Sequence, residues 1–509
     1  MKLNASHRTS ITGFMILIIF LLSSTLHGQT KDGEVHLPDY FSDPYVKISR
    51  IEVTGNKLTK ERIIIRELDF TPGDSLATMN DKSAYSLQIG QKRFARADSS
   101  EVAVRMNYSR ENIINTKLFL EVDLYLEQIV GEYYKLRIDV NERWYFWVFP
   151  IIQLDYPNFN DWLKHPDFSQ FTQGLFMSHN NLWGLGHQAS LKGYFGSSQG
   201  IGLGYYIPWI GKGQKTGLLL AGGYRNSSVV EYGSLDNQRQ MIYEKGSMKN
   251  YSFVGTLSFR PGLYNYSKVR LSAHNISISD SLYNLTLDES IASFLPEGMQ
   301  KINYLTLYIE YRYDSRNSHS YPLYGSYLMG FVNKQGLGIL SHDVNYFNYG
   351  VDLHFYQQIG DRWFTAEMFK LLTSSSENIP YYFKQNLTSG DDFIRGYDYY
   401  ALRGDNMYYF RSNLKYNLIK PAVKKPRKEK HQDSKFRSVP YAFYLNLIAD
   451  VGYMADDFYG AYNPYNNKML YSWGLGVDFV TYYDMVLRFE YILTNINSHG
   501  FFFGFGMPI

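Results

Sequence analysis

The sequence contains no cysteine, which excludes disulfide bonds, thiolate metal sites and a cysteine nucleophile. It also lacks an excess of charge of either sign, because 51 Lys and Arg residues face 48 Asp and Glu residues. Nucleic-acid-binding proteins normally carry a concentrated basic surface, so we expect no nucleic-acid partner. Beyond residue 28, no apolar run approaches the roughly 20 residues that a membrane-spanning helix needs. If the exported chain enters a membrane, it must therefore do so as a barrel.

Sequence patterns of catalysis are scarce as well. The 12 histidines are scattered, and none forms a His-x-x-x-His pair that would indicate a metal site. The stretch 211–217, GKGQKTG, lacks the residue order of a phosphate-binding loop, and no Gly-x-Ser-x-Gly elbow is present. The adjacent Asp391 and Asp392 are typical of a solvated loop. We therefore predict no catalytic residues, no metal, no cofactor and no enzymatic activity.

Residues 1–28 have the pattern of a secretory signal peptide. Lys2 and Arg8 supply the positive start, Ile11–Leu22 is the apolar segment, and small residues precede a predicted cut before Gln29. A membrane anchor is the alternative, but the apolar segment is too short to span. Residues 29–44 are polar, and we expect them to form a leader.

Residues 45–143 are predicted to form a small α+β domain. The order is strand (50–55), helix (from Thr59), irregular segment (75–108), helix (from Ser109) and two closing strands (120–126 and 136–140). Thr59 and Ser109 are the expected helix caps. A domain of this size that acts only as a spacer is the alternative.

What the sequence has in abundance is tyrosine, with 47 residues, and aromatic residues make up 17% of the chain. From residue 144 onwards, short segments alternate apolar and polar residues, as in Lys268–His274, Asn303–Asp314 and Asp484–Thr494. This alternation predicts strands with one greasy face and one wet face. A soluble β-sandwich has the same periodicity. The signal segment and the tyrosine content favour a membrane barrel, because tyrosine is enriched at membrane boundaries.

The predicted fold is therefore mostly β, with a transmembrane antiparallel β-barrel over residues 144–509. At about 9–11 residues per strand plus turns, roughly 16 strands fit this length. One segment of it, Lys424–Arg437, is strongly basic. A solvated turn is one reading of this segment, and docking of an acidic partner or an anionic lipid is the other.

One loop and the strand that follows it are central to the interpretation of the barrel sequence. Residues 389–416 begin with Gly390, Asp391 and Asp392, continue with Phe393-Ile394-Arg395-Gly396-Tyr397, and end in an alternating strand. A second Arg-Gly pair follows at Arg403-Gly404. An arginine between an apolar residue and a flexible glycine suits a charge folded into a polar cavity. Taken alone, the motif would be read as an exposed hairpin tip.

Two resemblances bear on these predictions. The first covers residues 45–143, where IEVTGN, TKERIIIREL, PGD and SRENIINTKLFLEVDL resemble the polypeptide-transport-associated (POTRA) domain. The segment between Pro72 and Ser109 is longer than the usual pattern, which indicates an insertion. The resemblance implies that an exposed strand edge binds extended client peptides by adding a strand.

The second resemblance is to the BamA/TamA-type outer-membrane assembly and translocation superfamily. It rests on the order of four motifs: NLWGLG at 181–186, YDSRNSHSYPLYGSY at 313–327, FIRGY at 393–397, and ADVG at 449–452. The resemblance implies that the loop enters the lumen and that Arg395 pairs with Asp450, beside Gly452. The residues after Phe505 depart from the family pattern, because a terminal aromatic residue is missing.

The resemblance further implies an outer-membrane protein of a Gram-negative bacterium, with the POTRA-like domain in the periplasm. Its expected partners are unfolded outer-membrane or secreted polypeptides, the lipid bilayer and accessory subunits. The implied mechanism is client capture by the POTRA-like domain and transfer to a weak seam between the first strand (144–155) and the last strand (501–507), or to the lumen. The alternatives are a secretion pore dedicated to one partner protein, and a porin or structural subunit of a larger complex.

Overall fold

The computed structural model describes residues 34–38, 41, 43–78, 100–154, 171–211, 213–296, 298–340, 343–375, 379–389, 392–423, 440–481 and 485–506. The predicted signal peptide (1–28), the acidic pair member Asp391 and the basic segment (424–437) lie outside these residues, as do half of the leader (29–44) and the last three residues. No helix in the described part of the chain is both long and apolar enough to cross a membrane.

The first unit, called the N-terminal unit below, is an α+β structure around a five-stranded sheet with strand order β1-β4-β5-β2-β3. Its elements are β1 (Val35–His36), β2 (Tyr45–Thr54), α2 (Glu61–Ile65), β3 (Ser75–Ala77), α3 (Glu101–Asn115), β4 (Phe119–Val130) and β5 (Tyr133–Glu142). Strands β4 and β5 are antiparallel, and β5 pairs with β2 in parallel. Apolar residues from one face of each helix and from one face of the sheet pack together in one buried cluster.

The two helices begin elsewhere than the sequence predicts. The N-cap of α2 is Lys60, and the Thr59 hydroxyl does not cap the helix but contacts the Tyr145 hydroxyl at 3.0 Å and accepts from Asn181 Nδ2 at 2.9 Å. Helix α3 begins at Glu101, and the Ser100 hydroxyl caps it by accepting the Ala103 N–H. Ser109 is inside this helix and fully buried, where its hydroxyl accepts the Asp69 N–H. The segment predicted to be irregular therefore contains β3 and the first half of α3.

The second unit is a 16-stranded sheet in which every pair of neighbouring strands is antiparallel, as predicted. Its strands are β6 (Phe146–Leu154), β7 (Phe171–Leu182), β8 (His187–Gly196), β9 (Gln199–Ile210), β10 (Thr216–Leu235), β11 (Gln238–Phe259), β12 (Asn265–Ile278), β13 (Lys301–Asp314), β14 (Gly325–Gln335), β15 (Tyr346–Gln358), β16 (Trp363–Ser374), β21 (Asn406–Val423), β22 (Pro440–Ala455), β23 (Met469–Thr481), β24 (Met485–Thr494) and β25 (His499–Gly506). The connections add α5 (Asp280–Leu285), η3 (Tyr381–Phe383), β17 (Gln385–Asn386), β18 (Thr388–Ser389), β19 (Asp392–Phe393), β20 (Arg403–Gly404) and α6 (Tyr459–Tyr462).

The two faces of this sheet differ in chemistry, as the alternation predicts. Val269 and Ile309 lie opposite each other on β12 and β13, and both side chains point outward and are exposed. Between such residues, Glu310 is buried on the other face, where Lys268 binds it at 2.6 Å. Apolar outside and charged inside is the arrangement of a barrel in lipid with a polar interior.

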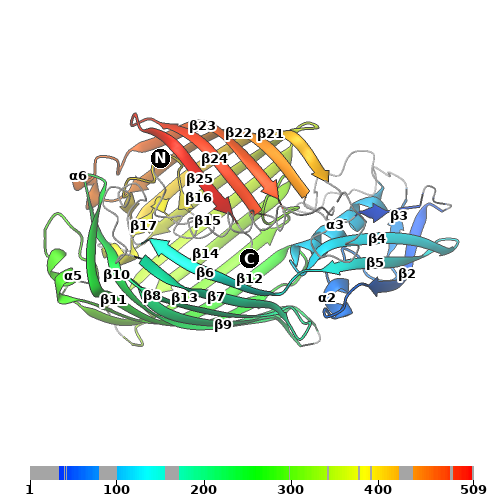
Figure 1. The fold of residues 1–509 in the computed structure, drawn as a ribbon, viewed down its shortest axis with the longest axis horizontal. Helices are drawn as coiled ribbons and strands as arrows, with labels where there is room; N and C mark the ends of the chain where they lie inside the picture. Colours follow the sequence, from blue (N-terminus) through cyan, green and yellow to red (C-terminus); the bar gives the residue numbers. More distant parts are fainter. Residues whose placement is uncertain are drawn as a thin grey trace.

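The two ends of the barrel are built differently. The N-terminal unit lies against one end, whereas α5, α6 and the tip of the long β10–β11 hairpin lie at the other (Figure 1). The loop between β16 and β21, residues 375–405, starts from this second end. We call these the near end and the far end of the barrel.

Candidate functional site: an arginine loop inside the barrel

The β16–β21 loop packs against the inner wall of the barrel. Ile394, Tyr397 and Leu402 of the loop are fully buried. They form an apolar cluster with residues of β21, β22 and β23, including Met407 and Met454. The loop is therefore fixed inside the lumen by burial of apolar side chains, which provides most of the free energy of such contacts.

Arg395 lies next to Ile394 and makes charged contacts with the same wall. Its Nε donates to Asp450 Oδ2 at 2.8 Å, its Nη2 donates to Asp450 Oδ1, and its backbone N–H donates to Asp450 Oδ2 at 3.1 Å. Its Nη1 donates to Asn413 Oδ1 at 2.7 Å and faces Glu490 Oε1 at 3.4 Å. The bidentate pair is the contact that the family resemblance implied. Bidentate guanidinium–carboxylate pairs are stronger and more directional than single contacts.

The charges around Arg395 balance. Arg411 lies opposite Asp450 on β21, with its Nε 3.8 Å from Asp450 Oδ2. Two arginines thus share this part of the wall with two carboxylates, Asp450 and Glu490. Asn413, Arg411 and Glu490 were not predicted as site residues. Their place on the polar side of alternating strands was visible in the sequence, but many lumen positions share that signal.

Two glycines make room for the loop. Gly396 has a φ of +91°, and a Cβ there would lie 2.7 Å from Thr494 Cγ2. Gly452 is on β22, and a Cβ there would lie 2.9 Å from Ile394 Cδ1. The glycine after the arginine thus permits the turn, and the glycine two residues after Asp450 makes room for Ile394.

The remaining motif residues extend the docking. The Tyr397 hydroxyl donates to the Tyr471 carbonyl oxygen at 2.9 Å and also contacts Asn495 Oδ1, so this ring reaches β23 and the turn after β24. The Phe393 backbone pairs with Thr388 in the short β18–β19 ladder. The structure therefore brings together the predicted residues 393–397, Asp450 and Gly452. Their functional role stays a prediction.

The NLWGLG motif lies in the turn between β7 and β8 and holds the N-terminal unit. Asn181 Oδ1 accepts the Gly186 N–H at 2.8 Å, and Asn181 Nδ2 donates to Thr59 Oγ1 at 2.9 Å. The Gly184 carbonyl accepts the Lys60 N–H at 2.9 Å. A Cβ at Gly184 would lie 1.9 Å from the Leu58 carbonyl oxygen, so only glycine fits.

The motif at 313–327 forms the hairpin between β13 and β14. Arg316 binds Asp314 in a bidentate pair at 2.8 and 2.7 Å, which fixes the start of the turn. Asn115 of α3 donates to the Asn317 carbonyl at 3.3 Å, and the Tyr324 hydroxyl contacts Glu111 of the same helix. This hairpin is therefore a second point at which the barrel holds the N-terminal unit.

A model of the Omp85 superfamily domain matches residues 181–491, which is more than half of the chain and includes all four motifs. The chain belongs to the Omp85 superfamily. No curated protein matches it.

Among solved structures, this Omp85 chain is similar to BamA from Haemophilus ducreyi lacking POTRA domains 1–3, at 14% identity and a TM-score of 0.49 over 90% of this chain and 84% of that one. It is also similar to CdiB from Escherichia coli, at 12% identity and a TM-score of 0.49 over 88% and 72% of the two chains. A third similar structure is CdiB from Acinetobacter baumannii, at 12% identity and a TM-score of 0.46 over 91% and 73%.

The Omp85 loop carries a second arginine contact that the sequence analysis did not assign. Arg403 Nε donates to Glu231 Oε1 on β10 at 2.8 Å. The Tyr381 hydroxyl donates to the same oxygen at 2.6 Å, and Arg239 Nη1 donates to Glu231 Oε2 at 3.1 Å. This pairing ties the loop to the β10–β11 hairpin. The Arg-Gly pair at 403–404 was noticed in the sequence, but nothing there identified its partner.

The sheet of the Omp85 barrel has two edge strands. Strands β6 and β25 are the terminal strands, and among the described residues no ladder joins them. They have 9 and 8 residues, against 20 and 22 in β10 and β11. β6 contains Pro150, which has no N–H to donate, and proline within sheets is found on edge strands.

Within the part of the Omp85 chain that the structure describes, no group of three or more His, Asp and Glu side chains could hold a metal ion.

Proposed function

We propose that this outer-membrane barrel assists the insertion of other polypeptides into the outer membrane, or their translocation across it, without catalysing a reaction. The observation that carries the proposal is that β6 and β25 each pair on one side only, and that no ladder joins them among the described residues. A client strand can add to an unpaired strand edge through main-chain hydrogen bonds, which do not depend on client sequence. The exposed outward-facing Phe146, Val148 and Phe501 place this seam in contact with lipid.

We infer that residues 45–143 are a POTRA-like domain in the periplasm and that it captures clients at the β4 edge. This edge already accepts a strand of the chain itself. Val35 and His36 pair with Leu124 and Tyr125 in parallel, and the Leu124 N–H donates to the Glu34 carbonyl at 3.0 Å. An edge that takes one extended segment has the geometry to take another.

The loop inside the lumen favours transfer through the seam over a passive porin. Arg395 binds Asp450 on β22, and Arg403 binds Glu231 on the part of β10 that projects beyond its pairing with β9, so the loop occupies space along the inner wall. A solute channel would need that space. A dedicated secretion pore would require the loop to leave the lumen.

The test uses the absence of native cysteine. Val148→Cys is combined in turn with Phe501→Cys and Phe503→Cys to lock the seam under oxidising conditions. The matched control is Val332→Cys with Tyr349→Cys, which are paired, partly exposed positions on β14 and β15. Each variant replaces the native protein, and the outer-membrane proteome is compared with that of a depleted strain.

We expect the locked seam to reproduce the depleted proteome, reducing agent to reverse the effect, and the control to have none. A locked seam that supports a normal set of barrel proteins would contradict insertion through it. Loss of one secreted protein alone on depletion would instead identify a dedicated pore. A fixed stoichiometric complex with no lost protein would identify a structural subunit.

A further inference from the structure

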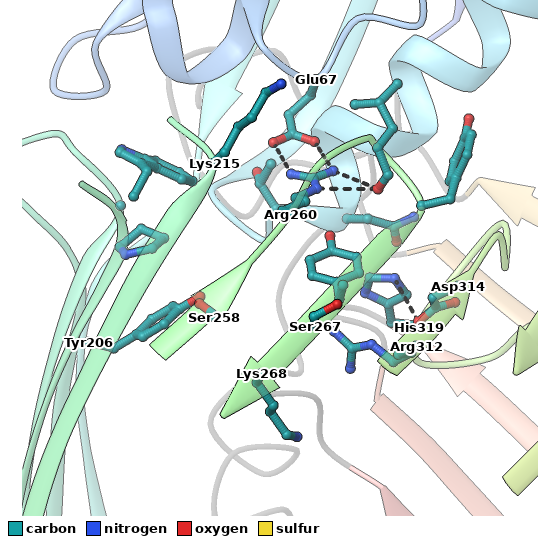
Figure 2. Close-up of a pocket in the computed structure, with 18 of the residues that line it drawn as sticks. Glu67, Tyr206, Lys215, Ser258, Arg260, Ser267, Lys268, Arg312, Asp314 and His319 are labelled. Atoms are coloured by element: carbon teal, nitrogen blue, oxygen red, sulfur yellow. Dashed lines mark hydrogen bonds and ion pairs between the residues drawn. The ribbon is translucent and has the colours of Figure 1, made fainter. Parts of the chain in front are cut away.

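A cavity of about 390 Å³ lies between the N-terminal unit and the near end of the barrel (Figure 2). Arg66, Glu67 and Asn112 of the N-terminal unit line one side of it, and lumen-facing residues of β9 and β11–β13 line the other. Its volume lies within the range of about 300–1,000 Å³ typical of small-molecule sites. It is separate from the site of Arg395, whose side chain binds residues of β21, β22 and β24.

The side chains around this cavity do not balance in charge. Seven Lys and Arg residues line it, against three carboxylates, which leaves an excess of four positive charges. Burial and the neighbouring cations lower the pKa of His319, in the β13–β14 hairpin, to about 4. This histidine is therefore neutral near pH 7 and changes nothing in the excess.

Each of the three carboxylates is already held by a cation. Glu67 binds Arg260 in a bidentate pair with both distances at 2.7 Å, and Figure 2 shows Arg260 directly beneath it. Glu310 binds Lys268, and Asp314 binds Arg316. Arg66 Nε also lies 3.3 Å from Glu67 Oε1. These pairs fasten the N-terminal unit and the hairpins. Lys215, Arg270 and Arg312 make no ion pair among the described residues.

Three buried N–H groups at the cavity have no hydrogen-bond partner in the described structure: Arg66 Nη1, Arg312 Nε and Trp209 Nε1. The Arg66 guanidinium lies over the Trp209 ring at 4.3 Å, and that of Arg312 lies over Tyr266 at 4.5 Å. The aromatic rings thus hold both guanidinium groups in place while N–H donors stay unused. Buried donors without an acceptor are costly, so a ligand that offers acceptor oxygens would be stabilised here.

We propose that this cavity is a binding site for an anion that carries phosphate groups. Water could satisfy the donors but would leave the surplus charge unmatched. A phosphate group carries about 1.5 to 2 negative charges and several acceptor oxygens, so two such groups match the four surplus cations. Arginine forks suit phosphate because they donate two parallel hydrogen bonds. The proposal does not depend on the insertion role.

The first arm of the test measures a soluble source. The full mature chain in non-ionic detergent is titrated calorimetrically with inorganic pyrophosphate at low salt. We expect saturable binding with one site per chain, and a loss of about ten- to hundredfold in affinity for Arg312→Gln and separately for Arg66→Gln. The matched control is Arg488→Gln, since Arg488 is an arginine of β24 outside the cavity lining.

The second arm measures a lipid source. The chain is reconstituted into nanodiscs with phosphatidic acid or with phosphatidylcholine, and retained lipid is counted by mass spectrometry after delipidation. Selective retention of phosphatidic acid that Arg312→Gln removes would assign the phosphate to a lipid headgroup. Folding of each variant is checked by the migration of unheated protein on gels. If neither arm shows binding, or if Arg488→Gln weakens binding as much as the cavity variants, the proposal is wrong.

Discussion

The lumen contains two arginine sites that differ in how completely the chain satisfies them. At the loop site, Arg395 finds Asp450, Asn413 and Glu490 within hydrogen-bonding distance. At the cavity between the N-terminal unit and the near end of the barrel, the Arg312 Nε has no hydrogen-bond partner among the described residues. Cations also outnumber carboxylates around this cavity. An arginine that the chain itself satisfies acts as a fastener. An arginine left with free donors is available to a ligand.

The largest expected effect comes from removing the satisfied arginine. Arg395→Ala leaves Asp450 buried without its bidentate partner, and Asp450 is about 1% exposed. Breaking a buried pair in this way costs about 3–5 kcal/mol, and less where water enters the lumen. We expect a marked fall in the fraction of folded barrel, measured by urea unfolding in detergent and by the migration of unheated protein on gels.

Arg395→Lys is the control for this prediction. Lysine keeps the charge but lacks the planar fork that reaches both Asp450 oxygens. Its effect should lie between those of the native residue and alanine. Equal stability of all three proteins would show that the loop is held by its apolar residues alone.

An intermediate effect is expected at the glycine that makes room for the loop. Gly452→Val adds atoms where even a Cβ would lie 2.9 Å from Ile394 Cδ1, so we expect a loss of about 1–3 kcal/mol by overpacking. Adding Ile394→Ala should recover part of it. Gly330→Val on β14 is the matched control, because a Cβ there meets nothing within 4 Å. Equal losses at both glycines would point to strand propensity instead.

The smallest effect on stability is expected at the unsatisfied arginine. Arg312→Gln removes a charge from a cavity that has too many, and it breaks no ion pair in the described structure. We expect a change within about 0.5 kcal/mol in the same urea unfolding experiment. A loss as large as that of Arg395→Ala would make Arg312 a fastener too and would remove the contrast between the two sites.

The barrel could be predicted from the sequence because its signal is local and repeated. Residues such as Val269 and Ile309 alternate with charged neighbours, and this alternation survives in the outward and inward faces of β12 and β13. Helix starts could not be predicted as well. Ser109 resembles a cap in sequence, but the helix extends back to Glu101 because residues from Val102 onward also pack into the core.

The contacts of the candidate sites divide in the same way. The pairing of Arg395 with Asp450 was expected through the resemblance of short motifs. The pairs between Glu67 and Arg260 and between Glu231 and Arg403 join residues far apart in sequence. Spacing along the sequence does not reveal which of these charges meet. Docking of the N-terminal unit brings Glu67 to Arg260, and the path of the β16–β21 loop brings Arg403 to Glu231.

The short strand β1 has a consequence for any client of the N-terminal unit. Val35 and His36 are joined to the strand edge they occupy through the chain itself, and the His36 ring also stacks on Tyr125 at 4.3 Å. A tethered segment reaches effective concentrations of about millimolar, so a free peptide must exceed that level or bind more strongly. If the N-terminal unit captures clients as proposed, residues 35–36 would be a built-in competitor that sets a minimum affinity for them.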